Sequence, residues 1–150
     1  MYHRQRNTIL LYLQDDDVRR VLVDATREQG WEPVEAATLD QALHAFSEQC
    51  ENLGIVVIDD MTGTNQGNRH GMLGIDFLQQ RSTHMFALNI PFVLLTFKEN
   101  TAIRDWADSM GGWVAAMPAR MSALLALFIK LELQHTPPVM PLKPNVLREL

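Results

Sequence analysis

Four short apolar runs and one weaker, strand-like run at residues 31–36 are each followed by a stretch with the spacing of an amphipathic helix. Runs of four or five consecutive apolar residues are typical of strands buried on both faces of a parallel sheet. Strand–helix alternation joins such strands by right-handed crossovers and places helices on both faces. We therefore predict a single three-layer α/β/α sandwich around a five-stranded parallel sheet. The expected strands span residues 9–13, 31–36, 55–58, 92–95 and 113–117, and the expected helices span 18–30, 39–46, 73–81, 102–110 and 124–131.

The size of the chain predicts one domain followed by a short tail. The chain has 150 residues, of which 47% are hydrophobic and 21% are charged, and this composition is sufficient for one buried core. Residues 1–135 are expected to form that domain. Residues 136–150 contain four prolines, so we expect them to be extended and to act as a linker or a docking segment. These prolines are Pro137, Pro138, Pro141 and Pro144.

Charge and hydropathy exclude several classes of protein. The net charge is −5 and the thirteen Lys and Arg residues are scattered, which argues against direct binding to nucleic acid. No run reaches the ~18 apolar residues of a membrane span, and the N-terminus has no signal-peptide pattern. Cys50 is the only cysteine, so no intrachain disulfide can form. We expect a cytoplasmic protein with no membrane or nucleic-acid contact.

Three consecutive aspartates, residues 15–17, precede the first expected helix. Acidic residues at this place cap the helix and complement its dipole, which is the interpretation that we favour. Alternatively, a shift of one or two residues would make Asp15 and Asp16 a metal-binding pair. That shift would move the helix off its expected apolar face, which holds Val18, Val21 and Leu22.

The candidate site lies where the strands end, because ligands of open parallel sheets bind at the carboxyl ends of the strands. Strand-end acids often bond turn amides, and a strand-end threonine can bond a nearby backbone group, so each residue also has a structural interpretation. The residues at these ends are Leu13, Gln14 and Asp15 after the first strand, Asp59 and Asp60 after the third, Thr96 after the fourth, and Met117 after the fifth.

In the order and spacing of its elements, the chain resembles the receiver domains of two-component response regulators, which are CheY-like, over about residues 7–134. The resemblance rests on residues 54–59 (GIVVID), on Thr96, on Pro118 and on the Asp17-Val18-Arg19 start of the first helix. It implies a flavodoxin-like sheet of order 2-1-3-4-5. It also implies that Asp59 occupies the phosphoacceptor position and Thr96 the switch position.

The chain departs from the receiver pattern at the residues that handle the phosphoryl group. Receivers place a pair of Mg²⁺-binding acids after the first strand, where this chain has Leu13 and Gln14. They place a lysine before the proline that follows the fifth strand, where this chain has Met117. Asp15 and Asp60 are the acidic remnants of such a pocket, and the loop over residues 60–72 is about seven residues longer than is usual for the family.

These departures favour a degenerate receiver, or pseudo-receiver, that regulates two-component-type signalling through protein–protein interaction and is not an enzyme. We expect no cofactor; Mg²⁺ would be required only by a working site, with Asp15 and Asp59 as its ligands. The expected partner is a protein or an output domain, and the resemblance implies a homodimer through residues 101–133. Two alternatives stay open: a response regulator phosphorylated on Asp59, and a small α/β enzyme that uses Asp59 and Asp60 as acid and base.

Overall fold

The computed structural model describes residues 6–59, 72–96, 101–116 and 121–135. Strands and helices alternate along the chain, as the apolar pattern predicts. The elements are β1 (Thr8–Tyr12), α1 (Asp16–Glu28), β2 (Glu32–Ala36), α2 (Leu39–Gln49), β3 (Leu53–Asp59), α3 (Met72–Ala87), β4 (Phe92–Thr96), α4 (Thr101–Ser109), β5 (Trp113–Ala116) and α5 (Met121–His135).

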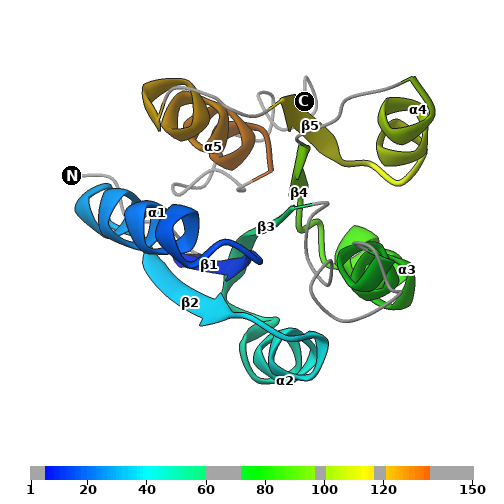
Figure 1. Ribbon diagram of the computed structural model, residues 1–150, viewed down its shortest axis with the longest axis horizontal. Coiled ribbons are helices and arrows are strands. Elements are labelled where there is room, and N and C mark those ends of the chain that lie inside the picture. The colour runs from blue at the N-terminus through cyan, green and yellow to red at the C-terminus, as the bar shows by residue number, and fades with distance from the viewer. Residues whose placement is uncertain (1–5, 60–71, 97–100, 117–120, 136–150) are drawn as a thin grey trace, which may run out of the picture.

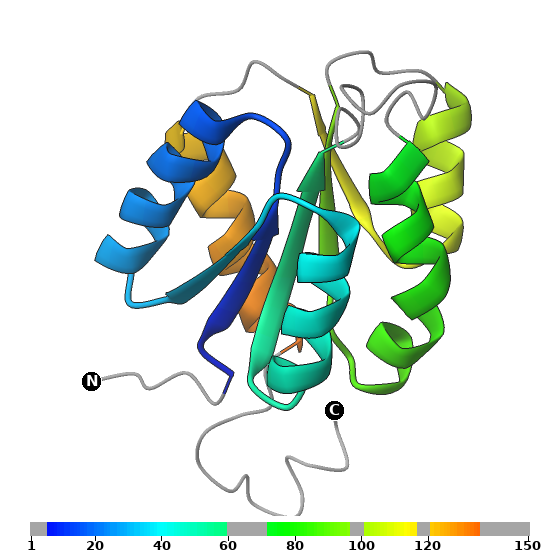
Figure 2. The ribbon, with the colours of Figure 1, turned by 60° about the horizontal axis from the view of Figure 1, so that its bottom comes forward.

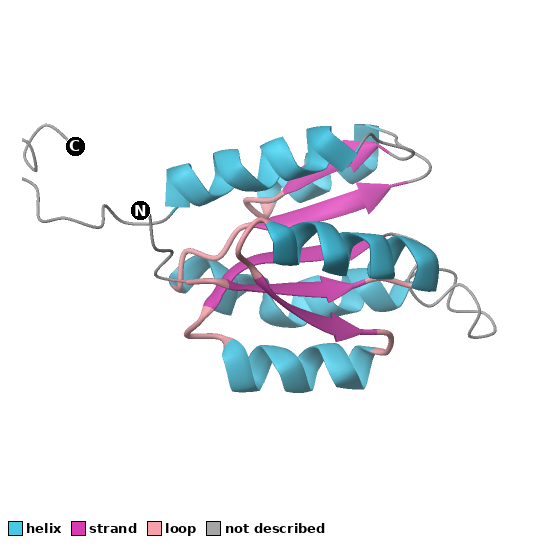
Figure 3. Cartoon of the chain, turned by 90° about the vertical axis from the view of Figure 1, so that its left-hand side faces the viewer, coloured by secondary structure: helices cyan, strands magenta, loops and turns pink. Residues whose placement is uncertain are grey.

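The five strands form one parallel sheet in the order β2-β1-β3-β4-β5. All the strand arrows point the same way, with helices on both sides (Figure 3). Helices α1 and α5 cover one face, and α2, α3 and α4 cover the other (Figure 1). The predicted sandwich and its strand order are confirmed, and because all the strands are parallel, their carboxyl ends lie at the same end of the sheet (Figure 2).

The sheet separates two apolar clusters. On the α2–α3–α4 face, the ring of Phe77 packs edge-on against Tyr12 and Phe46, with centroid distances of 5.8 and 6.0 Å. On the α1–α5 face, Leu22 and Phe128 pack against alternate residues of the central strands. Strand alternation therefore fills both layers, as expected for a sheet buried on both faces.

Local sequence signals explain several element boundaries. Thr38 caps α2 by accepting from the Gln41 amide at 3.1 Å, and the Gln41 side chain accepts from the Ala37 amide at 2.8 Å, so the two residues act together as in a capping box. Gly30 follows α1 with a φ of 92°, the left-handed conformation that glycine adopts without strain. Pro33 lies in β2, an edge strand, where a missing amide is tolerated.

Helix α3 is longer than the sequence predicts. The pattern suggested an end near Arg81, but the helix continues to Ala87 because Met85 extends its buried face. Asn89 then reverses the chain with a φ of 59°, and the Ile90 amide donates to the Met85 carbonyl at 2.8 Å. A left-handed asparagine of this kind ends helices much as glycine does.

The expected apolar face of α1 is wrong at one residue. Val21 is 51% exposed, whereas its neighbours Leu22 and Val23 are buried, together with Thr26. The Thr26 hydroxyl donates to the Leu22 carbonyl at 2.7 Å, so this polar side chain needs no water and can occupy the core face.

No helix among the described residues is long and apolar enough to cross a membrane.

Candidate functional site

The predicted site residues that the structure describes gather at the carboxyl edge of the sheet. In the register of the sheet, Asp59 pairs with Leu95, and Thr96 pairs with Ala116. Asp59 and Thr96 therefore end neighbouring strands, and the turn after β1 lies on the other side of β3. Asp60, with the rest of residues 60–71, and Met117, with residues 118–120, lie outside the described residues.

Asp59 is a buried carboxylate that is bound to the turn after β1. It is 2% exposed, and its Oδ2 accepts from the Gln14 backbone amide at 2.9 Å. A carboxylate buried at this depth requires charge-assisted hydrogen bonds of this kind. The contact joins residues 45 positions apart and ties the end of β3 to the turn after β1.

Asp15 faces the adjacent helix. Its Oδ1 accepts from the amides of Asp17 at 2.8 Å and Val18 at 3.0 Å, and it is the N-cap residue of α1. The predicted capping role is confirmed. Asp15 is exposed, and one of its two carboxylate oxygens accepts the hydrogen bonds of two amides in the first turn of α1.

Arg19 stabilises the turn after β1 through its side chain. One of its guanidinium nitrogens donates to the Leu13 carbonyl at 2.6 Å. Its Nε donates to Glu35 at 3.1 Å, and it also pairs with Asp16. The turn after β1 is thus held by hydrogen bonds from the chain itself.

Leu13 and Gln14 are the two residues that directly follow β1. Leu13 is fully buried and packs in the apolar cluster of the α1–α5 face. Gln14 contributes its backbone amide to Asp59. Neither residue supplies a carboxylate, so the position offers a hydrogen-bond donor and an apolar side chain where a cation site requires oxygen anions.

Among the described residues of this site, Asp15 and Asp59 are the carboxylates that a Mg²⁺ ion would meet. This ion takes octahedral oxygen coordination that normally includes one or two carboxylates. Asp59 already accepts a hydrogen bond at Oδ2 and Asp15 caps α1. Within the described ranges, no three His, Cys, Asp or Glu side chains are placed to hold a metal ion.

Tyr12 is a polar member of this region that the sequence interpretation treated only as part of an apolar run. Its side chain is fully buried, and its hydroxyl has no hydrogen-bond partner among the described residues. Burial raises the pKa of Tyr12, and the charges of Asp59, Asp76 and Asp40 raise it further. A hydroxyl inside a run of aliphatic residues was the signal that could have identified it.

We expect Tyr12→Phe to raise the free energy of unfolding by about 1 kcal/mol at neutral pH, because a buried hydroxyl without a partner is costly. The pKa of Tyr12 in the folded chain lies above its ordinary value of 10.0. The folded state therefore keeps a proton that the unfolded state loses above about pH 10, so stability falls as the pH rises past that value. Urea unfolding at neutral and alkaline pH should show that Tyr12→Phe reduces this loss.

The matched control is Tyr2→Phe, since the chain has only these two tyrosines. Identical alkaline stability curves for the two variants would show that Tyr12 carries no such linkage.

Comparisons with known proteins place the fold. No protein-family model matches the sequence, and no curated protein is similar to it. Among solved structures, the HemR receiver domain from Leptospira biflexa superimposes with a TM-score of 0.70 at 19% identity, over 89% of this chain and 98% of that one. The RstA receiver domain from Klebsiella pneumoniae gives 0.68 at 17% identity, over 84% and 98%. The NtrC4 receiver domain, solved as a beryllofluoride-activated dimer, gives 0.68 at 18% identity, over 87% and 99%.

These structures superimpose on most of the chain, and structural similarity at such low sequence identity shows the fold alone. This chain has the fold of the response regulator receiver domains.

Proposed function

We propose that this chain is a receiver-like regulatory domain of two-component-type signalling that acts through protein contacts and has a degenerate phosphorylation site. The observation that carries the proposal is the turn after β1. There, a buried leucine and a glutamine stand where a working site needs two acids, and the Gln14 amide binds the Asp59 carboxylate.

The charges around Asp59 support this proposal. Transfer of a phosphoryl group to a carboxylate depends on positioning and on cations that neutralise the developing charge. Leu13 contributes no charge, and the Asp15 side chain caps α1. Arg19, the cation of this turn, is bound to the Leu13 carbonyl, Glu35 and Asp16. Met117 has no ammonium to replace the family's lysine, because a thioether is neutral and donates no hydrogen bond.

The fixed turn also supports the proposal. A metal-binding turn must present its oxygens toward the phosphoacceptor, and this one is held by the Gln14–Asp59, Asp15–α1 and Arg19–Leu13 hydrogen bonds. Opening it for a cation would break the Gln14–Asp59 and Arg19–Leu13 hydrogen bonds, which are partly buried, and a buried polar group left unpaired costs about 1–3 kcal/mol.

The proposal is tested by titrating the full chain with beryllofluoride and Mg²⁺ while tryptophan fluorescence is recorded. Trp106 and Trp113 lie on α4 and β5. A conformational change that starts at Asp59 and Thr96 would alter the surroundings of these two side chains and therefore their fluorescence. We expect no saturable change. A saturable change that Asp59→Asn abolishes would contradict the proposal and favour a phosphorylatable response regulator.

We also propose that partners, including a second copy of the chain, bind the face formed by α4, β5 and α5. Trp106, Val114 and Trp113 are partly exposed there, and the Lys130 ammonium lies 5.0 Å from the centroid of the Trp113 ring. Aromatic side chains with a neighbouring cation are typical of interface centres.

Sedimentation velocity over a concentration series is expected to show a dimer that Lys130→Glu weakens. The control is Arg27→Glu, which makes the same charge reversal on the exposed last turn of α1. A chain that stays monomeric at every concentration would rule out the homodimer.

A further inference from the structure

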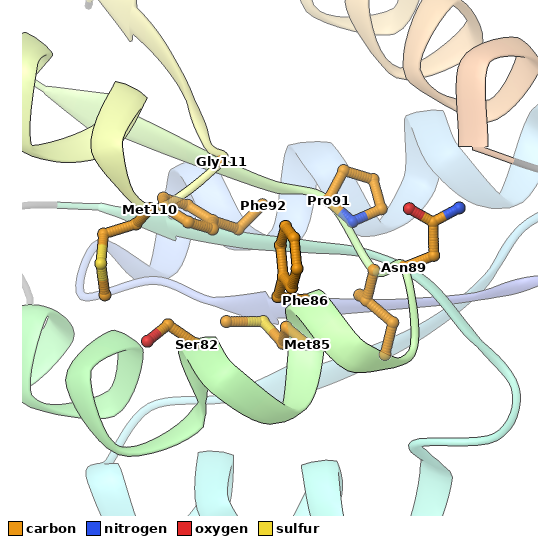
Figure 4. A pocket seen from close by; sticks show the side chains of 9 residues that line it. Ser82, Met85, Phe86, Asn89, Pro91, Phe92, Met110 and Gly111 are labelled. Carbon is orange, nitrogen blue, oxygen red and sulfur yellow. The ribbon is translucent and has the colours of Figure 1, made fainter.

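An apolar groove lies at the end of the sheet where the strands begin, opposite the end that carries Asp59. It is located between the end of α3 and the turn from α4 to β5. It consists of two adjoining hollows of about 110 and 210 Å³. Both are lined by Ser82, Phe86, Met110 and Gly111, and the first extends to Pro91 and Phe92. Figure 4 shows the Phe86 ring standing between α3 and the segments that carry Pro91, Phe92 and Met110. We call this surface the Phe86 groove.

Phe86 is the unusual residue of this surface. Its side chain is 80% exposed, whereas Phe46, Phe77 and Phe92 are buried. An exposed ring beside apolar hollows is typical of a binding surface, whereas single exposed aliphatic residues are common and carry no such meaning. Ser82, a buried polar residue, also lines both hollows.

The fifteen residues after α5 have the composition that such a groove accepts. They begin Thr-Pro-Pro-Val-Met-Pro-Leu-Lys-Pro and contain two overlapping Pro-x-x-Pro sequences, at residues 138–141 and 141–144. Proline-rich segments of this kind adopt a polyproline II helix at low entropic cost and bind grooves lined with aromatic residues.

The tail also starts at the correct edge. Helix α5 runs antiparallel to the strands, so its last residue, His135, lies toward the edge where β4 begins, as does the end of α3 (Figure 2). The groove is on the opposite face of the sheet, and crossing two packed layers requires about 20 Å. A polyproline II segment advances about 3.1 Å per residue, so the tail spans this distance by about Pro141.

From the exposed ring, the composition of the tail and the position of the end of α5, we propose that residues 141–144, the second Pro-x-x-Pro sequence, bind the Phe86 groove of their own chain as a polyproline II segment. The site is separate from the edge that carries Asp59, so this proposal does not depend on the phosphorylation state. The docked tail would cover Phe86. When a partner binds the tail and removes it from the groove, Phe86 would be exposed again.

Paramagnetic broadening of amide signals tests the proposal on the full chain. In a Cys50→Ser background, Asn145→Cys provides one site for a nitroxide label, because Cys50 is the only native cysteine. We expect the label to reduce the signals of Phe86, Ile90 and Met110 selectively. Phe86→Ser should abolish this loss, and so should Pro141→Ser combined with Pro144→Ser.

The matched control is Val21→Ser, which removes another exposed apolar side chain, on α1, and should leave the broadening unchanged. Absence of selective broadening at the groove would overturn the proposal. Broadening that appears when isotope-labelled chain is mixed with a separate nitroxide-labelled chain would also overturn it, because the occupant would then be a second copy.

Discussion

Restoring the missing charges is expected to make this chain accept a phosphoryl group at Asp59. The variant is Leu13→Asp combined with Gln14→Asp and Met117→Lys, incubated with Mg²⁺ and a small acyl phosphate. An Asp59 oxygen would attack the phosphorus and form an O–P bond as the bond to the donor's carboxylate oxygen breaks. Each transition-state group restored in comparable sites is worth roughly 10²–10³-fold in rate, so the variant should react at least that much faster than the native chain. Mass spectrometry of the intact protein measures the phosphorylated fraction over time.

The control for this experiment is the same variant with Asp59→Asn, which should gain no phosphoryl group. A native chain that is phosphorylated as fast as the restored variant would contradict the proposed degeneracy.

The restored variant should also become dependent on Mg²⁺ for stability. Leu13 is fully buried and Asp59 is 2% exposed, so Leu13→Asp places a second carboxylate in an apolar region and should destabilise the metal-free protein. Binding of Mg²⁺ at a concentration 100 times its dissociation constant would return about 2.7 kcal/mol. The native chain should show no comparable rise in its melting temperature.

Phe77→Ala is expected to lower the free energy of unfolding by about 3–5 kcal/mol. The Phe77 ring is fully buried and contacts Tyr12 on β1 and Phe46 on α2 from its position on α3. Removing it leaves a cavity at the junction of three elements and also removes two edge-to-face ring contacts. Urea unfolding and thermal melting measure the loss, which corresponds to a fall in melting temperature of about 10 °C.

Phe86→Ala, which removes another phenylalanine ring from α3, is the control. Phe86 is 80% exposed, so Phe86→Ala should cost no more than about 1 kcal/mol. Equal losses for the two variants would show that the α2–α3 layer is not packed around Phe77.

Much of the fold could be predicted from local patterns. Apolar runs at residues 9–13, 55–58 and 92–95 determined three central strands, since only a strand buried on both faces requires such runs. Thr38 with Gln41 and Gly30 marked helix ends, because capping depends on neighbouring residues alone. The same local reasoning placed Asp59 and Thr96 at strand ends, and the resemblance to receiver domains implied that Leu13 and Gln14 stand where those domains carry acids.

The contacts of the candidate site depend on residues far apart in the chain, so the tertiary structure alone decided them. The bond between the Gln14 amide and Asp59 spans 45 positions and depends on the register of β1 against β3. The exposure of Val21 depends on the angle at which α1 lies on the sheet. The charges around Tyr12 come from β3, α2 and α3, and the Phe86 groove is formed by α3 together with the two turns that lead into β4 and β5. Periodicity specifies which face of an element is buried, but packing specifies which side chains meet across that face.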